Sequence, residues 1–301
     1  MKANFWLTMS DETEVYVQKW YDAKNSPKAI VQLAHGMVEH IERYDEFANF
    51  LQEQGIFVYG NDHRGHGKTG NKQGIMGFFA EEDGFSKTMN DLVEITNHIK
   101  QEYPSTPLYL FGHSMGSFLA RMYIQQYSDK LDGLILSGTG YYNKASTLAG
   151  KNIALKLAPK EKSPFMNKLA FGGFNRKINN PKTNFDWLTR DQDKVKEYMQ
   201  DEYNGFIPTG RFFYDLMTGL DTIHNQKNNK TIRADLPVFI ISGDADPVGN
   251  YGKGVWKVAH LLTDAGLTNV TTMLFDGARH EVLNEVNRKE VYDTILEWIG
   301  H

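Results

Sequence analysis

The fold of this chain is decided by one stretch, Pro107-Leu108-Tyr109-Leu110-Phe111-Gly112-His113-Ser114-Met115-Gly116-Ser117. Its apolar residues follow a proline in a short run, which predicts a buried β-strand. Residues 117–124 then carry apolar side chains three and four positions apart, and this spacing predicts a helix. The stretch therefore places a Gly-x-Ser-x-Gly pattern at a strand-to-helix turn, with the Ser114 hydroxyl expected at the C-terminal edge of the sheet.

The two glycines of this pattern have a physical reason. A turn tight enough to expose Ser114 forces strained backbone geometry on that residue, and the strand and the helix then nearly touch. Gly112 and Gly116 leave the room that a side chain would fill. Gly-x-Ser-x-Gly alone is a loose pattern that also arises by chance. The strand before it and the helix after it favour a nucleophilic serine over a chance match.

Composition sets wide bounds on the class of protein. The chain has 301 residues, of which 41% are hydrophobic, so it can form one large α/β domain or a domain with an insertion. Its net charge of −4 argues against a nucleic-acid partner or an acidic membrane partner. The absence of cysteine excludes disulfides, thiolate nucleophiles and cysteine-ligated metal.

Targeting signals are not evident in the sequence. The first nine residues contain one lysine and a short apolar patch, and the charged run Asp11-Glu12-Thr13-Glu14 follows closely. This pattern is too short for a secretory signal. No apolar run approaches the roughly 18 residues that a membrane span needs. The sequence therefore predicts a soluble, cytoplasmic protein without a stable membrane span.

Strand and helix patterns alternate along most of the chain. The expected strands are residues 4–9, 14–21, 29–34, 56–60, 107–111, 131–137, 236–242 and 270–275. The expected helices are residues 44–54, 85–103, 117–124, 251–265 and 286–299, and residues 61–70 are expected to form a glycine-rich loop. The first two strands predict a hairpin, and the rest predict a doubly wound parallel sheet.

The alternation breaks between residues 141 and 232. No apolar strand run occurs there, and about 90 residues are too many for a loop in a compact domain. We therefore expect an inserted, mostly helical cap at 141–232, with residues 1–140 and 233–301 forming the core. Most aromatic residues of the cap are expected to form its own small core, and some are expected to face Ser114. The aromatic residues concerned are Phe165, Phe171, Phe174, Trp187, Tyr198, Phe206, Phe212, Phe213 and Tyr214.

Three residues that suit nucleophilic catalysis follow expected strand ends. Functional groups of an open parallel sheet gather at the carboxyl ends of its strands, and Ser114, Asp246 and His280 each come just after such an end. A serine hydroxyl needs a base, which His280 can be, and the base needs an acceptor, which Asp246 can be. The order Ser, acid, His is that of the α/β-hydrolases. These three residues are the expected catalytic triad.

Several motifs resemble those of α/β-hydrolases of the monoacylglycerol lipase and lysophospholipase group. They are His35-Gly36-x-x-Glu39-His40 with Arg43-Tyr44, Asp62-x-Arg64-Gly65-His66-Gly67, Gly112-His113-Ser114-Met115-Gly116 and Gly243-x-x-Asp246. Thr69 stands where the group commonly has serine. The resemblance covers nearly the whole chain outside the cap. It implies an α/β-hydrolase fold, with a mostly parallel eight-stranded sheet, helices on both faces and an inserted helical cap.

The resemblance also implies an oxyanion hole. It would be formed by the backbone N–H groups of Met37, in the His-Gly loop, and Met115, which follows the nucleophile. Because these donors belong to the backbone, replacing the Met37 or Met115 side chain should matter less than replacing Ser114.

Other candidate residues have simpler interpretations. Asp244 lies two residues before Asp246, but the Gly-x-x-Asp spacing favours Asp246, which leaves Asp244 to brace the turn. Asp62, His63 and His66 could suggest a metal site, but charged residues in a glycine-rich turn more often hydrogen-bond the backbone. His35 and His40 are expected to brace loops, and Glu281 to be solvated or salt-bridged. Gly67-Lys68-Thr69 lacks the first glycine of a phosphate loop. Neither a metal nor a cofactor is expected.

The expected function is that of a serine hydrolase that cleaves carboxylic esters of small lipid-like substrates through an acyl-enzyme, with monoacylglycerol as the first choice. A lysophospholipase or a short-chain carboxylesterase would use the same chemistry. A proline-type aminopeptidase would need an acidic cap residue for the free amine, and Glu197, Asp201 and Glu202 are available. A catalytically silent ligand receptor is the alternative from another class, which the intact Ser, Asp and His argue against.

Overall fold

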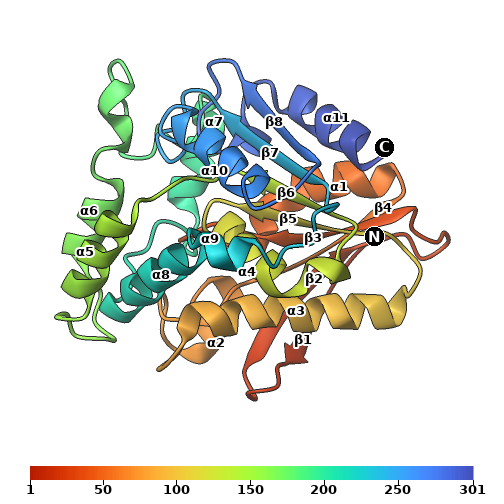
Figure 1. Ribbon diagram of the computed structural model, residues 1–301, viewed down its shortest axis with the longest axis horizontal. Coiled ribbons are helices and arrows are strands. Elements are labelled where there is room, and N and C mark those ends of the chain that lie inside the picture. The colour runs from red at the N-terminus through yellow and green to blue at the C-terminus, as the bar shows by residue number, and fades with distance from the viewer. Residues whose placement is uncertain (301) are drawn as a thin grey trace.

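An eight-stranded sheet runs through the middle of the molecule in the computed structural model, which describes residues 1–300 (Figure 1). The strands are β1 (Lys2–Thr8), β2 (Glu14–Trp20), β3 (Ala29–Ala34), β4 (Ile56–Asn61), β5 (Leu108–His113), β6 (Gly133–Ser137), β7 (Val238–Gly243) and β8 (Val270–Phe275). Their order in the sheet is β1-β2-β4-β3-β5-β6-β7-β8. β1 pairs with β2 and β2 with β4 in antiparallel fashion, and the remaining pairs are parallel. The predicted hairpin and mostly parallel sheet are confirmed.

Helices cover both faces of this sheet. The helices outside residues 141–232 are η1 (Ile41–Tyr44), α1 (Asp45–Glu53), α2 (Gly67–Gln73), α3 (Gly84–Glu102), α4 (Met115–Tyr127), η2 (Ser128–Lys130), α10 (Lys253–Thr263), η4 (Val282–Asn284) and α11 (Arg288–Ile299). Apolar side chains of α3, α4 and α10 pack in one core, and those of α1 and α11 pack in a second core on the other face. Strands β3, β4 and β7 are buried along their whole length because they lie between these two layers.

The structure corrects the glycine-rich loop that the sequence predicted at residues 61–70. Residues from Gly67 onward form the helix α2, although glycine is a poor helix former. Tertiary hydrogen bonds explain the difference: the Lys68 N–H donates to Asp62 Oδ2 over 2.7 Å, and the Tyr16 N–H of β2 donates to Thr69 Oγ1 over 2.9 Å. These contacts hold the turn in helical geometry against the sheet.

The segment between residues 141 and 232 is helical, as predicted. It holds α5 (Lys144–Ala154), α6 (Pro164–Phe171), η3 (Phe174–Lys177), α7 (Gln192–Gln200), α8 (Gly210–Ile223) and α9 (Gln226–Asn229). Among the described residues of this segment, β structure is limited to one isolated bridge between Lys162 and Thr209. α5 and α6 lie at the rim of the molecule, away from the sheet (Figure 1).

The aromatic residues of this segment divide into two groups. Phe212 and Phe213 of α8 are fully buried in the main core beside α3 and α4, which differs from the prediction of a separate small core. Trp187 and Tyr198 do form a separate cluster, against which Phe171 packs. The amphipathic α8 joins the main core because its apolar face lies directly on α4.

Candidate active site

Ser114 lies at the turn between β5 and α4. Its backbone has φ 51° and ψ −118°, a conformation that is strained for a residue with a side chain. The Ser114 N–H donates a hydrogen bond of 2.9 Å to the carbonyl oxygen of Ser137, at the end of the neighbouring β6. This hydrogen bond to β6 therefore stabilises the strained backbone of Ser114, and the Ser114 side chain lies at the C-terminal edge of the strands.

Close packing at this turn requires the two flanking glycines. A Cβ atom on Gly116 would overlap the carbonyl oxygen of Ala34 in β3, and one on Gly112 would overlap the carbonyl oxygen of Gly116. These neighbours are backbone atoms, which cannot move aside as a flexible side chain can. The structure thus confirms that the glycines leave room where strand and helix nearly touch.

Asp246 and His280 are brought together from the ends of β7 and β8. His280 Nδ1 lies 3.0 Å from Asp246 Oδ2. A carboxylate only accepts hydrogen bonds, so the Nδ1–H donates and Nε2 is left free on the neutral ring. Asp246 is fully buried and also accepts from Ser242 Oγ over 3.0 Å and from the Val248 N–H over 2.8 Å.

Asp244 has a different environment. It is exposed, and its Oδ1 accepts a hydrogen bond of 2.8 Å from the Gly277 N–H. This contact ties the turn after β7 to the turn after β8. The carboxylate of Asp244 therefore braces the turn, as the sequence predicted, and it does not contact His280.

The His280 imidazole is buried among groups that affect its charge. Its ring centroid lies 5.1 Å from that of Trp187 and 4.7 Å from that of His113. Burial lowers the pKa of His280, but the neighbouring carboxylates, Asp246 first among them, outweigh burial and raise the pKa above its usual value. Ser114 and His280 line the same cavity. Among the hydrogen bonds of residues 1–300, the His280 ring bonds to Asp246, and Ser114 Oγ does not bond to His280.

The loop after β3 passes beside Ser114. Its Val38 has φ 53°, which is unusual for a β-branched residue, and its Gly36 N–H donates to Glu39 Oε1 over 2.5 Å. The Val38 carbonyl oxygen accepts from the Gly205 N–H over 2.9 Å and from Tyr198 Oη over 3.2 Å. The loop is therefore held both from within and from the 141–232 segment.

The two backbone N–H groups expected at the oxyanion hole are available. Within the described part of the chain, neither the Met37 N–H nor the Met115 N–H donates a hydrogen bond to another residue. Met115 is the first residue of α4, so its N–H has no partner inside the helix. Met37 lines the same cavity as Ser114.

A buried ion cluster lies behind this loop. Arg43 contacts Glu39 and also donates two hydrogen bonds of 2.7 Å to Glu281, and Tyr44 Oη donates to Glu39 over 2.8 Å. Burial raises the pKa of Glu281, but Arg43 outweighs burial and lowers that pKa to about 2. Glu281 is thus salt-bridged, one of the two predicted alternatives. The cluster joins the loop after β3 to the residue that follows His280.

The remaining candidate residues brace loops. His35 Nε2 accepts a hydrogen bond of 2.9 Å from the His63 N–H, and His40 Nε2 contacts Asp201 Oδ2 over 2.7 Å. Asp62 accepts from the backbone N–H groups of Ile41 and Lys68. Within residues 1–300, no group of three or more His, Cys, Asp or Glu side chains is arranged to hold a metal ion.

A cavity of about 440 Å³ opens over Ser114 and His280. Its wall combines the loop after β3 with side chains from the 141–232 segment. The aromatic residues on this wall are Phe171, Phe185, Trp187, Tyr198 and Phe206. Asn167, Lys168, Asn175 and Asn184 also line the cavity, so its wall combines an aromatic part, which suits a ligand with an alkyl chain, with a polar part.

Several residues of the site were missed by sequence reasoning. Ser242 holds Asp246, Ser137 holds the Ser114 backbone, and Phe185 lines the cavity. Ser242 and Ser137 each stand at or beside the end of a predicted strand, the position where polar groups gather, and that position was the available signal.

No helix within residues 1–300 has the length and apolar content that a membrane span requires.

Comparisons with known proteins identify the family of this chain. The family model described as "Serine aminopeptidase, S33" (Hydrolase_4) matches residues 25–287. The chain is 28% identical to a monoacylglycerol lipase of Mycolicibacterium smegmatis over 91% of this chain and 88% of the relative. It is 24% identical to a monoglyceride lipase of Rattus norvegicus over 98% of this chain and 89% of the relative.

A solved structure is also similar over nearly the full length. It is a highly thermostable carboxyl esterase from Bacillus coagulans in complex with glycerol, with a TM-score of 0.91 and 31% sequence identity over 99% of this chain and 98% of that chain. The fold, the family match and these relatives lead to one conclusion. The chain belongs to the Hydrolase_4 family and is a serine hydrolase of the α/β-hydrolase fold, in the monoglyceride lipase group, that cleaves carboxylic esters.

Proposed function

We propose that this chain hydrolyses monoacylglycerols through an acyl-enzyme formed on Ser114, with His280 as general base and Asp246 as its partner. The observation that carries the proposal is the common cavity: Ser114 and His280 both line it, and aromatic side chains of the 141–232 segment form its wall. A triad beside an apolar wall suits an ester with a long alkyl chain and a small polar alcohol.

The proposed reaction uses the position of Ser114 and His280 in one cavity and the hydrogen bond between His280 and Asp246. Ser114 Oγ attacks the ester carbonyl carbon while His280 Nε2 takes its proton. Asp246, fully buried and bonded to Nδ1, stabilises the imidazolium that forms. His280 then protonates the leaving alcohol. In the second half, His280 takes a proton from water, which attacks the acyl carbon and releases the fatty acid.

The negative oxygen of each tetrahedral intermediate would be bound by the N–H groups of Met37 and Met115. Neither donates a hydrogen bond to another residue of the described chain, so both are free to act. Removing one such donor typically slows an enzyme by about 100- to 1,000-fold. The bonds that hold Gly36 and Val38 keep this loop in a single geometry before substrate arrives.

We propose residues 141–232 as a cap on a core formed by residues 1–140 and 233–301. The cap would bind the acyl chain, because each buried methylene contributes about 0.8 kcal/mol to binding. A glycerol head group agrees with the names of the relatives, which are monoacylglycerol lipases, and with the esterase structure that contains glycerol. Lipid metabolism in the cytoplasm is the role proposed for such an activity.

A lysophospholipase activity is the second candidate, and one observation favours it. Lys168 of α6 lines the cavity, where its ammonium group could bind a phosphate on the substrate head group. The chemistry at Ser114 would be unchanged. The difference between the two candidates lies in the alcohol that leaves.

An aminopeptidase activity has less support. Such an enzyme needs a carboxylate in the cavity for the free amine of its substrate, and Glu197, Asp201 and Glu202 are not among the cavity-lining residues described. The acidic residues on the wall are Glu39 and Glu281, and both are already paired with Arg43.

The test is hydrolysis of a matched panel by the wild type and by Ser114→Ala. The panel holds a medium-chain monoacylglycerol, a lysophospholipid of the same acyl length, a short p-nitrophenyl ester and a prolyl amide. We expect the highest kcat/KM on the monoacylglycerol and loss of activity in Ser114→Ala. Preference for the lysophospholipid that is lost in Lys168→Gln would select the second candidate. Turnover of the amide alone would contradict both.

A further inference from the structure

The backbone that carries His280 is tied to the 141–232 segment by successive hydrogen bonds. The His280 N–H donates to the Trp187 carbonyl oxygen over 3.3 Å, and the Glu281 N–H donates to that of Leu188 over 2.7 Å. The N–H of the preceding residue, Arg279, donates to Glu285 Oε1 over 2.8 Å. Three consecutive N–H groups around the base are therefore occupied, and Glu285 supplies the one side-chain acceptor.

Glu285 holds both sides of this junction. Its side chain is fully buried. Besides the Arg279 N–H, its Oε1 accepts a hydrogen bond of 3.1 Å from the Arg190 N–H, and its Oε2 accepts one of 2.8 Å from Arg190 Nε. Oε2 also accepts from the Val286 N–H over 3.1 Å. One carboxylate thus binds the His280 loop and the segment that contains Trp187 and Leu188.

A second set of contacts, made by side chains, crosses the junction in both directions. Arg279 Nη1 donates to the carbonyl oxygens of Asp186 and Thr189 over 2.7 and 3.0 Å, and Thr189 Oγ1 donates to that of Asn284 over 2.9 Å. The ring of Trp187 from the same segment packs on the His280 imidazole. The segment that forms part of the cavity wall therefore also supports the base.

From these contacts we infer that Glu285 is a positioning residue for His280, acting through the Arg279 N–H on one side and Arg190 on the other. The inference rests on the proposed role of His280 as the base. Glu285 is not among the described residues that line the cavity over Ser114. Its function is to keep the backbone of residues 279–281 hydrogen-bonded to residues 187–190, so that His280 Nδ1 stays within hydrogen-bond distance of Asp246.

The chemistry of the junction explains why a carboxylate is needed there. All groups that face Glu285 donate hydrogen bonds, and a carboxylate accepts on both of its oxygens. Glutamine has nearly the same shape, but its amide nitrogen is a donor. In Glu285→Gln this nitrogen would replace either Oε1, which faces the N–H groups of Arg279 and Arg190, or Oε2, which faces Arg190 Nε and the Val286 N–H. In both orientations at least one backbone donor loses its acceptor. The contact between the His280 loop and residues 187–190 is then weakened, although the volume of the side chain at position 285 hardly changes.

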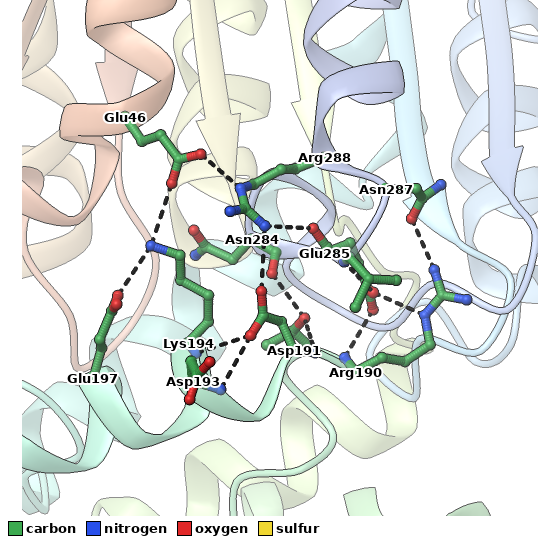
Figure 2. A network of polar contacts seen from close by, with 12 residues as sticks. Glu46, Arg190, Asp191, Asp193, Lys194, Glu197, Asn284, Glu285, Asn287 and Arg288 are labelled. Carbon is green, nitrogen blue, oxygen red and sulfur yellow. Dashed lines mark hydrogen bonds and ion pairs between the residues drawn. The ribbon is translucent and has the colours of Figure 1, made fainter.

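Figure 2 shows that Glu285 belongs to a larger polar network, which supplies a matched control. In that network Arg288 pairs with Glu46 over 2.6 Å and with Asp191 over 3.2 Å, and Lys194 pairs with Glu46 over 3.3 Å. Glu46 is partly exposed, and its ion pairs within the described chain are with Arg288 and Lys194 and not with residues 279–281. Glu46→Gln therefore removes ion pairs of the same network but leaves the His280 loop untouched.

The experiment compares the wild type, Glu285→Gln, Arg190→Gln, the double variant and the Glu46→Gln control with one ester substrate, well below the unfolding temperature. We expect Glu285→Gln to lower kcat by about 10- to 100-fold with KM changed less than threefold. Arg190→Gln should give a smaller loss, and the double variant should be no worse than Glu285→Gln, because both residues serve one junction. Glu46→Gln should stay within twofold of the wild type.

The pH profile separates positioning from a loss of folded protein. If the contact between His280 and Asp246 loosens, the acid limb of kcat/KM should move to lower pH in Glu285→Gln and stay in place in Glu46→Gln. The inference would be overturned if the kcat of Glu285→Gln stayed within twofold of the wild type. It would also be overturned if the loss of kcat equalled the loss of folded protein measured by circular dichroism and the acid limb did not move.

If Glu285→Gln does not fold, Arg190→Gln tests the inference by the same measurements, because the Arg190 side chain is partly exposed. Ser114→Ala run beside these variants reports separately on the proposed function, because it should be inactive whatever Glu285 does.

Discussion

Asp244 and Asp246 lie two residues apart, yet their carboxylates have different surroundings. Asp246 is fully buried and accepts hydrogen bonds from His280, Ser242 and the Val248 backbone, whereas Asp244 is exposed and accepts one from Gly277. A buried carboxylate beside an imidazole stabilises its protonated form, and an exposed one on a turn does not. The two residues therefore make a matched pair for testing the acid of the triad.

We predict that Asp246→Asn lowers kcat by about 1,000- to 10,000-fold, because an amide does not stabilise the imidazolium and permits the wrong tautomer of His280. Asp244→Asn should lose less than about threefold. Steady-state kinetics on one ester measures both. Near wild-type turnover in Asp246→Asn would contradict the triad, and a large loss in Asp244→Asn would move the role of acid to that residue.

A second prediction at this scale concerns pH. His280 acts as a base only when neutral, and its folded pKa is raised above 6.5, with burial outweighed chiefly by Asp246. Activity should therefore be low in acid and rise through an apparent pKa above 6.5 in the kcat/KM profile. Glu281→Gln removes one of the carboxylates that raise this pKa, so its acid limb should lie at lower pH. An acid limb well below 6.5 in the wild type would contradict the electrostatic account.

At the scale of elements, the site depends on how closely α4 approaches β3. Gly116 lies in the first turn of α4, and a Cβ atom there would overlap the carbonyl oxygens of Ala34 and His35. The backbone of β3 is fixed by β4 and β5 on its two sides, so it has little freedom to move away. Overpacking of this kind in a closed interior typically destabilises by about 1–3 kcal/mol.

We therefore predict that Gly116→Ala lowers the free energy of unfolding by about 1–3 kcal/mol and lowers kcat as well, because the shift displaces the Met115 N–H beside Ser114. Urea denaturation and kinetics measure the two effects. Gly173→Ala is the control, since the nearest atom to its new Cβ is 3.4 Å away on the flexible Arg176 side chain. Equal stability of Gly116→Ala and the control would contradict the close approach.

The elements also show where sequence reasoning succeeded and failed. β3 and β8 have the predicted bounds, because short apolar runs between breakers identify buried strands well. α2 was missed, because its sequence Gly67-Lys68-Thr69-Gly70 has poor intrinsic helix propensity and depends on contacts with Asp62 and β2. Such contacts come from residues distant in the chain or in the preceding turn, and no local pattern records them.

At the scale of the whole molecule, three histidines are buried together between the sheet and the 141–232 segment. The ring centroids of His35 and His63 lie 4.1 Å apart, and those of His35 and His66 lie 5.3 Å apart. His66 also packs against Phe206 and Phe212. Burial lowers the pKa of His63 to about 3 and that of His66 to about 4. The rings of His63 and His66 are therefore neutral in the folded protein down to about pH 4, and below pH 6.5 they take up protons when the chain unfolds.

This arrangement predicts acid sensitivity. The folded pKa of His66 is below its unfolded value near 6.5, so its contribution to stability is complete above pH 6.5 and is lost as pH falls towards 4. Relative to His66→Asn, the wild type should lose about 3 kcal/mol of unfolding free energy between pH 7 and pH 4. Urea denaturation at several pH values measures this difference. The exposed His260 gives a control in His260→Asn, which should keep the pH dependence of the wild type. A His66→Asn profile parallel to the wild type would contradict the account.

The sequence by itself determined where strands and helices follow one another along the chain and that residues 141–232 are helical. It also determined the residues expected to form the site, which are Ser114, Asp246 and His280. It could do so because apolar periodicity and the chemistry of strand ends are local properties. Tertiary structure alone decided that Phe212 and Phe213 join the main core, that Arg43 bridges Glu39 and Glu281, and that Glu285 seats the His280 loop on residues 187–190. The contacts of Arg43 with Glu281 and of Arg190 with Glu285 join residues far apart in sequence, so they exist only once the sheet and the helices have packed together.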